Sequence, residues 1–548
     1  FIYLNGYFCC MFEFFSWEIV FSIFAALALF LYGIDNFSKE VQKSLGENFR
    51  NLLAKLTQFP IVGVFLGAIV TAIVQSSAAT TVITVSLVNA GVLSFGQTLG
   101  IIIGSNIGTT ITSQLVALNL TYVAPIFIVI GFVIDIIGRK YKFVGKPLFY
   151  FGLVFFSLNL LSSSVQPFVS DPFILELFSN LSSPFLAVIV GFIFTVILQS
   201  SSVTSGIIIV LAQSGLISFA QGLPIILGAN IGSTTTSLIA SRKMDLFARR
   251  TAIAHTFFNI VGVLIMIPFL IPFSTFVISL GGNEAQMIAN AHLLFNIITA
   301  IVFLVIINQW KRIIEIIVPG EEKEIVFKTK YLTNKTPSET NEAFVLIESE
   351  IRNSIEITLD TFRSSIEALD TKDNLNKQNY LFSRVTKLVS LGEFVNKKIQ
   401  IALFDLSKRK LGEKSAQKLG VYVRALNEIK RIQNWASDIS VLNQLAIERE
   451  ANLARSYVIE FKEIYALLDK NLEHLSKEFP NINKKCFLEM QKNDAILREK
   501  ITQAYQNQVK EISQVSESTD QTFLELLSII ESAASRTREL RKMIENKN

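Results

Sequence analysis

One polar segment occurs twice within otherwise apolar parts of this chain. The first Gln-Ser-Ser segment, at 75–81, returns 124 residues later as the second Gln-Ser-Ser segment, at 199–205. Two further blocks keep the same spacing without a gap: 90–97 with 214–221, and 104–113 with 228–237. An internal repeat inside apolar sequence is typical of transporters built from two related halves. The duplication therefore predicts a transporter.

Charged side chains are distributed unevenly over the 548 residues. Residues 1–320 hold 25 of them (14 Lys or Arg and 11 Asp or Glu), and residues 321–548 hold the other 70. We therefore predict a transmembrane transporter domain at 1–320, a linker at 321–341 and a soluble helical domain at 342–548. The net charge of +5 is spread over both domains and does not suggest a nucleic-acid partner. The 3 Cys form no CxxC pair, so they predict neither a metal site nor a disulfide framework.

Seven apolar stretches are long enough to cross a bilayer. They lie near 17–34, 98–117, 123–138, 147–165, 218–240, 251–280 and 285–310. Two others, 59–90 and 184–215, are also apolar, but each has a Gln-Ser-Ser segment at its centre. At ~1.5 Å per helical residue, half of such a stretch is too short to cross ~30 Å of hydrocarbon. Each is therefore predicted to form a re-entrant helical hairpin.

The Lys and Arg residues between these stretches predict the topology. They gather in three predicted loops: Lys39, Lys43, Arg50 and Lys55; Arg139, Lys140, Lys142 and Lys146; Arg242, Lys243, Arg249 and Arg250. If both hairpins re-enter, all three loops face the cytoplasm. The repeats at about 17–138 and 147–280 are then inverted relative to each other, and the extra span at 285–310 delivers residues 342–548 to the cytoplasm.

The predicted fold class is therefore all-α, a multi-pass protein of the cell (inner) membrane in contact with membrane lipid. No basic region precedes the first apolar stretch, so we expect no cleavable signal peptide. The chain opens on Phe1, and Met11 is an alternative start that would leave residues 1–10 outside the native chain.

Both repeated blocks are rich in polar side chains but carry no charge. No Asp, Glu, Lys, Arg or His lies between Lys55 and Asp135, or between Glu176 and Arg242. Polar groups at membrane depth need partners, and hydroxyl, amide and freed carbonyl oxygens suit Na⁺. Helix N-termini at the hairpin tips suit an oxyanion. Because the blocks hold no fixed positive charge, a bound anion would need a co-bound cation.

The glycine-containing runs at 104–108 and 228–232 are predicted to break their helices and to open backbone groups toward the hairpin tips. The alternative interpretation is that Ser, Thr and Gly only permit close helix packing. That alternative explains the Gly and Ser residues. It does not explain two copies of the same Gln followed by Ser-Ser and by a Thr three positions further on.

The paired Gln-Ser-Ser segments, with Thr80 and Thr204 and an Asn-Ile-Gly-Thr/Ser-Thr run downstream, resemble the type II sodium/phosphate cotransporter family over roughly 20–310. This resemblance implies sodium-coupled transport of inorganic phosphate, Na⁺ as the coupling ion, no organic cofactor, and a central site where the two segments meet. By position it implies the site residues Gln75, Ser76, Ser77, Thr80, Gln199, Ser200, Ser201, Ser202 and Thr204. Neighbouring polar residues complete the candidate substrate and cation site: Thr81, Asn106, Thr109, Thr110, Ser205, Asn230, Ser233 and Thr234. The first copy departs from the second at Ala78, which stands where the second has Ser202.

A smaller echo pairs His255 with Asn259 and His292 with Asn296, each four residues apart on one helix face. Such pairs also occur in proteins of this family. We favour interhelical hydrogen bonds over a role in transport for both pairs.

Apolar residues recur every three to four positions after residue 340, which predicts six amphipathic helices. The helices lie near 343–369, 374–402, 413–445, 449–475, 484–513 and 517–546, and they suit two three-helix bundles. This domain resembles PhoU-like regulatory domains. Glu356 and Asp360 fit the acidic spacing with which such domains bind metal, whereas Lys430 and Asn434 replace two acidic ligands.

The leading hypothesis is sodium-coupled transport of inorganic phosphate across the plasma membrane, with 342–548 as a regulatory domain. One alternative keeps the fold but transports another oxyanion or exports phosphate. A second alternative is a membrane-anchored phosphate-signalling scaffold. Residues 342–548 also offer a surface for a homo-oligomer or a cytoplasmic regulatory partner. An enzyme is not expected, because no nucleophile–base pair, P-loop or other nucleotide motif is present.

Overall fold

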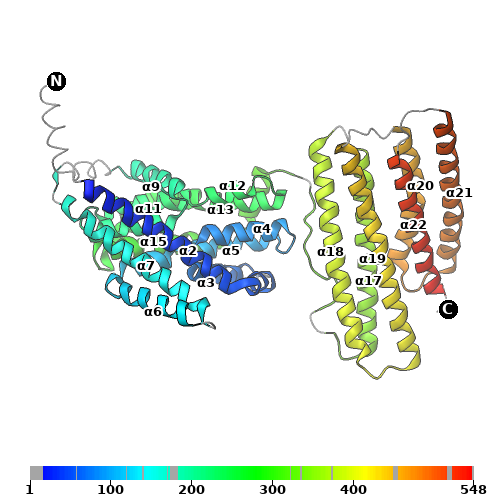
Figure 1. Cartoon of the computed structure of the whole chain (residues 1–548), viewed down its shortest axis with the longest axis horizontal. Helices are drawn as coiled ribbons and strands as arrows, with labels where there is room; N and C mark the ends of the chain where they lie inside the picture. The colour runs from blue at the N-terminus through cyan, green and yellow to red at the C-terminus, as the bar shows by residue number, and fades with distance from the viewer. Residues whose placement is uncertain are drawn as a thin grey trace. The chain divides into compact units, whose positions relative to one another are not determined.

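The computed structural model describes residues 17–545 except for gaps at 57–58, 119, 139–140, 170, 173–182, 321, 334–335, 372–373, 449–454 and 515–520. Across these described ranges every regular element is a helix. Contacts divide the chain into two units, Phe1–Glu324 and Ile325–Asn548, which are described separately below (Figure 1).

The first unit contains the duplicated blocks. Its first described helix is α2 (Trp17–Leu56), which has 40 residues. The helices of the first half are α3 (Pro60–Val74), α4 (Ser77–Asn89), α5 (Phe95–Ala117), α6 (Ala124–Ile137) and α7 (Lys142–Val165). Those that follow are α9 (Pro184–Leu198), α10 (Ser201–Gln213), α11 (Phe219–Gly232), α12 (Thr235–Ser241), α13 (Leu246–Met266), α14 (Leu270–Ser279), α15 (Glu284–Val305) and α16 (Ile307–Ile317).

Among the described residues, six helical segments are long and apolar enough to cross a membrane. They are Trp17–Ser44, Phe95–Ala117, Lys142–Phe168, Phe219–Ser241, Leu246–Ser279 and Glu284–Val305. The seventh predicted span, near 123–138, forms α6, which has 14 residues. A 3₁₀ turn, Leu120–Val123, leads directly into α6, and at ~2.0 Å per residue it brings the helical segment close to ~30 Å of hydrocarbon. Both Gln-Ser-Ser stretches form pairs of shorter helices, α3 with α4 and α9 with α10.

The first predicted basic loop is wrong, because α2 continues through it to Leu56. Lys39 and Lys43 lie on this helix and form ion pairs with Asp35 and Glu40, three or four residues earlier. Pairs at this spacing stabilise a helix, so the charges mark the polar end of α2 rather than its termination. Other predicted loop residues also lie on helices: Lys142 and Lys146 on α7, and Arg249 and Arg250 on α13. Arg139 and Lys140 lie outside the described residues.

The predicted helix break at 104–108 is also wrong, because α5 runs unbroken through this glycine-containing run. A Cβ at Gly104 would stand 2.0 Å from the carbonyl oxygen of Val64 on α3. At the corresponding position, a Cβ at Gly228 would stand 1.9 Å from the carbonyl oxygen of Val188 on α9. The glycines therefore permit close contact between helix backbones. In the second copy a break does occur, but it follows the run, since α11 ends at Gly232 and α12 begins at Thr235.

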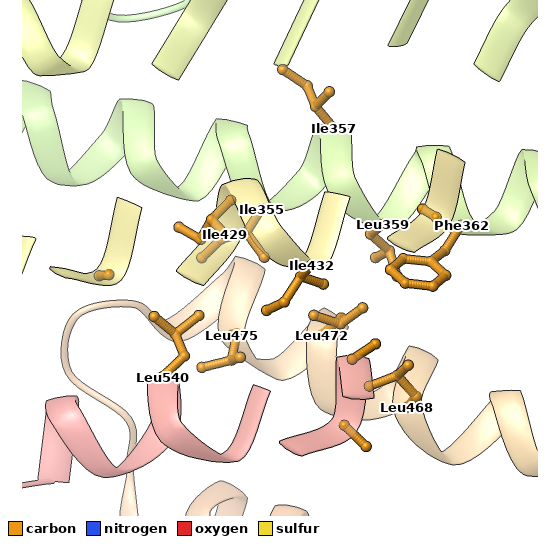
Figure 2. Close-up of a cluster of buried hydrophobic side chains, with 14 of the residues drawn as sticks. Ile355, Ile357, Leu359, Phe362, Ile429, Ile432, Leu468, Leu472, Leu475 and Leu540 are labelled. Atoms are coloured by element: carbon orange, nitrogen blue, oxygen red, sulfur yellow. The ribbon is translucent and has the colours of Figure 1, made fainter. Parts of the chain in front are cut away.

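The described residues of the second unit form six helices, as the apolar spacing predicts. They are α17 (Thr340–Leu369), α18 (Leu375–Ser407), α19 (Glu413–Glu448), α20 (Arg455–Glu478), α21 (Lys484–Gln514) and α22 (Gln521–Glu545). Each of the triplets α17–α19 and α20–α22 is in mutual contact. The triplets do not have separate cores, however. Figure 2 shows Ile355 of α17, Ile432 of α19, Leu472 of α20 and Leu540 of α22 within one apolar cluster.

Each unit also holds its own side of the boundary at residues 324 and 325 by hydrogen bonds. In the first unit, Arg250 donates to the carbonyl oxygens of Val318 and Gly320, and the backbone N–H of Phe95 donates to Glu324. In the second unit, the buried carboxylate of Glu350 on α17 accepts the backbone N–H groups of residues 330–332. Within the predicted linker, Glu324 is thus hydrogen-bonded to the first unit and residues 330–332 to the second.

Candidate substrate-binding site

The two Gln-Ser-Ser segments form the turns between paired helices. Gln75 ends α3 with a φ of 58°, and Gln199 ends α9 with a φ of 53°. Within the described residues they are the only non-glycine residues with positive φ. The left-handed conformation costs about 1–2 kcal/mol for an L-residue other than glycine. Backbone strain of this kind is concentrated at functional sites, and here the same residue of both copies carries it.

The serine after each Gln begins the next helix. The Ser76 side chain accepts a 3.2 Å hydrogen bond from the Ala79 N–H, and the Ser200 side chain accepts a 3.3 Å bond from the Val203 N–H. Both serines are therefore N-caps, which place the positive ends of α4 and α10 at the two turns. Two helix N-termini are thus available to an anion without a charged side chain.

At each turn, a hydrogen bond between two threonines joins the two helices that the turn connects. Thr71 of α3 bonds Thr80 of α4 at 2.9 Å, and at the corresponding positions Thr195 of α9 bonds Thr204 of α10 at 2.7 Å. All four side chains are buried. The structure therefore places the predicted site residues Thr80 and Thr204 between the two arms of each hairpin, and they do not line the cavity described next.

Both turns face one cavity of about 670 Å³. Eight of the predicted residues line it: Gln75, Ser76, Ser77, Gln199, Ser200, Ser201, Ser202 and Ser233. These residues come from segments that are far apart in sequence, and they bring side-chain oxygens from both copies to a common space. The wall they form is uncharged and polar, which suits hydrogen bonding to an oxyanion or coordination of a hard cation.

Thr112 of α5 connects the two copies directly. Its hydroxyl donates a 2.6 Å hydrogen bond to the side-chain oxygen of Gln75 and lies 3.5 Å from the hydroxyl of Ser202 on α10. Sequence reasoning did not select Thr112 as a site residue. The available signal was its position inside the repeated block 104–113.

The other predicted residues lie behind the cavity wall. Asn106, Thr109, Thr110 and Thr234 donate to carbonyl oxygens three or four residues earlier on their own chain segments, a local pattern common in helices. Thr81 and Ser205, at corresponding positions of the two copies, are buried and their hydroxyls have no hydrogen-bond partner among the described residues. Two matched hydroxyl oxygens are therefore free to bind a ligand or a cation.

The two histidines make interhelical hydrogen bonds, as the sequence predicts. His292 of α15 bonds Ser113 of α5 at 2.8 Å through Nδ1, and Asn230 of α11 at 3.1 Å through Nε2. His255 of α13 bonds Ser237 of α12 at 3.3 Å. Ser113 and Ser237 correspond in the repeat, so each copy is bonded to one histidine. Asn230 thereby belongs to a buried network that joins α5, α11 and α15.

The predicted metal-binding pair on α17 lies beside cationic side chains. Glu356 is 3.5 Å from Lys330, and Asp360 is 3.9 Å from Arg384. No group of three or more His, Cys, Asp or Glu residues that could hold a metal ion occurs among the residues described. A metal bound here would have to displace both cations, and the site stays a prediction.

A third wall of the cavity comes from α2. Tyr32, Asp35, Ser38, Lys39 and Gln42 line it together with the two turns. Sequence reasoning missed these residues, since α2 precedes the duplicated blocks and its charged end was interpreted as a loop.

A family model and several related proteins match the part of the chain that contains both turns. The family model described as Na⁺/Pi-cotransporter matches twice, at residues 29–163 and 161–318. The Bacillus subtilis protein YqeW, whose name assigns no function, is 32% identical over 305 residues, which cover 55% of this chain and 99% of that protein. The Escherichia coli protein YjbB, named for a proposed inorganic phosphate export activity, is 27% identical over 315 residues, 57% of this chain and 58% of YjbB. The human sodium-dependent phosphate transport protein 2B is 34% identical over 137 residues, 23% of this chain and 20% of that protein.

No solved structure matches the chain. The family assignment therefore depends on sequence, and the two family matches together cover residues 29–318, which include both Gln-Ser-Ser segments. By these matches this chain, whose two Gln-Ser-Ser turns have positive φ at the same residue and face one cavity, belongs to the Na⁺/Pi-cotransporter family.

Proposed function

We propose that this protein moves inorganic phosphate across the cell membrane together with Na⁺, at the cavity between the two Gln-Ser-Ser turns. The observation that carries this proposal is the matched strain at Gln75 and Gln199, whose positive φ values occur at equivalent positions beside one cavity. The N-termini of α4 and α10 lie at the same turns, so backbone N–H groups would bind the phosphate oxygens.

The absence of charge on the two turns supports sodium coupling. The turns contribute only uncharged side chains to the cavity wall, so a phosphate bound between them needs a cation to offset its loss of hydration. The unpartnered hydroxyls of Thr81 and Ser205 are candidates for Na⁺ ligands. Sodium-dependent phosphate transport is also what the human relative is named for.

The paired short helices support re-entrant hairpins in inverted repeats. α3 and α9 have 15 residues each, and α4 and α10 have 13, so at ~1.5 Å per residue none of them spans ~30 Å of hydrocarbon. In the view of Figure 1, α9 is drawn toward the end of the first unit at which α2 begins, and α3 and α4 are drawn toward the other end. This placement fits hairpins that enter from opposite faces of the membrane.

The second unit would then lie in the cytoplasm and regulate transport. The basic residues Lys39, Lys43, Arg242 and Lys243 would share its side of the membrane under the positive-inside rule. Six helices around one core fit the PhoU-like regulatory domain that the sequence resembles. This arrangement fits a location in the plasma membrane, which in a bacterium is the cell (inner) membrane.

Phosphate export is the second candidate function. YjbB is named for proposed phosphate export, and the aligned part of the chain spans about 58% of its length. The same site serves either direction, because a secondary transporter moves its substrate along the combined gradients of substrate and coupling ion.

The test is radiolabelled phosphate uptake into proteoliposomes, with an inward Na⁺ gradient against a matched K⁺ gradient. We expect Na⁺-dependent uptake that is lost in Gln199→Ala and Ser200→Ala. Ser86→Ala is the matched control, since Ser86 is an exposed residue of α4 outside the cavity. Phosphate efflux at a rate independent of the Na⁺ gradient would favour phosphate export without sodium coupling. A folded protein without any phosphate flux would overturn the proposal.

A further inference from the structure

Helix α2 contributes a polar stripe to the cavity. Asp35, Ser38, Lys39 and Gln42 all line it, and their spacing of three, four and seven residues puts them on one face of a helix. Gln42 donates a 3.0 Å hydrogen bond to the buried hydroxyl of Ser38. The stripe is therefore an ordered wall opposite the uncharged turns.

The stripe holds the only charged residues among those that line this cavity, and they are paired with each other. The Lys39 ammonium lies 2.6 Å from a carboxylate oxygen of Asp35, and the two side chains are 60% and 59% exposed. An ion pair this exposed contributes roughly 0–1 kcal/mol. Lys39 can therefore leave Asp35 at little cost when a stronger anion arrives.

Packing holds the stripe in place beside the second turn. Phe30 of α2 is fully buried, and its ring lies where a Cβ at Gly206 of α10 would stand 2.8 Å from the ring edge. At the other end of the stripe, Ser44 donates a 3.2 Å hydrogen bond to the carbonyl oxygen of Phe143 on α7. The ammonium of Lys39 is thus presented to the cavity by a helix that is anchored on both sides of it.

We propose that Lys39 exchanges partners during phosphate binding, from the Asp35 carboxylate to a phosphate oxygen, and that Asp35 competes with phosphate for it. This inference rests on the proposed function of the cavity. An ammonium group offers three donors without a fixed orientation, so it can follow an oxyanion from the mouth of the cavity toward the turns. Asp35 repels a phosphate that approaches without a cation. Once Lys39 has moved to the phosphate, the Asp35 carboxylate has no ion-pair partner. That free carboxylate attracts a cation into the cavity at the moment when the anion enters.

The two residues are distinguished by opposite effects on phosphate affinity. We would measure equilibrium binding of radiolabelled phosphate to the purified full-length chain at saturating Na⁺. Lys39→Gln removes the attracting charge and should weaken phosphate binding by roughly two- to fivefold, and Asp35→Asn removes the competitor and should strengthen it by a similar factor. Lys39→Arg keeps the charge and should bind phosphate within about twofold of the wild type. Both effects should shrink when choline chloride raises the ionic strength.

Lys43→Gln is the matched control, because Lys43 pairs with Glu40 one turn further along α2 and does not line the cavity. A purely structural ion pair would make Lys39→Gln and Asp35→Asn shift the dissociation constant in the same direction, and that result would overturn the exchange. Unchanged binding in both variants would overturn it as well. If Gln199→Ala still abolishes phosphate binding in these cases, the proposed function stands and only this inference fails. Absence of phosphate binding to the folded wild type would overturn both.

Discussion

The hydroxyl of Thr112 donates a 2.6 Å hydrogen bond to the side-chain oxygen of Gln75, whose backbone is in the left-handed conformation. The same hydroxyl lies 3.5 Å from Ser202, which belongs to the other copy of the repeat. One side chain of α5 therefore holds the first turn and contacts the second. We infer that this contact between the two copies of the repeat helps to set the geometry of the cavity.

Thr112→Val should weaken phosphate binding by roughly tenfold. The substitution keeps the shape of the side chain but leaves the buried Gln75 oxygen without its donor, which costs about 1–3 kcal/mol. Thr236→Val is the matched control, since Thr236 is the corresponding residue of the second copy and donates to the backbone oxygen of Ser233. Equilibrium phosphate binding to both variants measures the difference. Equal affinity of the two variants would show that the bond to Gln75 does not organise the site.

Gln199→Gly should separate stability from transport. Glycine adopts positive φ without strain, so the substitution removes a conformational cost of about 1–2 kcal/mol and should raise the apparent melting temperature of the purified protein. Phosphate flux should fall, because the exposed Gln199 side chain that faces the cavity is lost. Thermal unfolding in detergent and proteoliposome uptake check the two effects. A variant that melts lower than the wild type would contradict the interpretation that Gln199 is strained.

Gly228→Ala should destabilise the first unit by about 1–3 kcal/mol or more, because overpacking forces closely packed neighbours apart. The added Cβ would stand 1.9 Å from the carbonyl oxygen of Val188, so α9 and α11 must separate. The control is Gly96→Ala at the start of α5, where a Cβ would meet no atom within 4 Å. Apparent melting temperatures of the two variants give the comparison. We expect Gly96→Ala to match the wild type, and similar losses in both would point to a general effect of the substitution.

The proposed entry of the two hairpins from opposite faces of the membrane predicts opposite labelling of their first residues. Phe59 and Ser183 are exposed and precede Pro60 and Pro184 at the starts of α3 and α9. In a chain freed of its native Cys, a membrane-impermeant maleimide should label Ser183→Cys in intact cells. The same reagent should label Phe59→Cys only after the cells are permeabilised. Labelling of both positions from the same side would rule out the inverted arrangement.

Much of the helical architecture could be predicted from the sequence because long apolar stretches and amphipathic spacing are local signals. The six helices of the second unit and the divided helices at both Gln-Ser-Ser segments follow from such patterns. The end of α2 does not, because the helix continues through Lys39 and Lys43 to Leu56, where the charges favoured a loop. Charge alone cannot distinguish a polar helix end from a loop.

The glycine runs show a second limit of local reasoning. Gly104 and Gly228 were predicted to break helices, but their role depends on the backbone of Val64 and Val188, which approaches from another helix. Contacts of this kind are not encoded in the run itself. The spacing of 124 residues, equal for both pairs, was the signal that the two contacts would be the same.

The candidate site was predictable only in part for the same reason. The repeat identified both turns, and both face one cavity. Thr112 bonds the first turn, and the stripe on α2 lines the same cavity. Both depend on contacts between distant parts of the chain, which no local pattern predicts. Conversely, Thr80 and Thr204 have the right residue type but brace the hairpin arms.

The most direct test of the central claim is the stoichiometry of phosphate binding to the purified chain in Na⁺. If the two turns form one site, the wild type binds one phosphate per chain, and Ser76→Ala and Ser200→Ala each weaken that same binding event. The double variant should then bind phosphate little more weakly than the single variant with the lower affinity, as expected for coupled residues. Two phosphates per chain, with each substitution removing only one of them, would contradict a shared site.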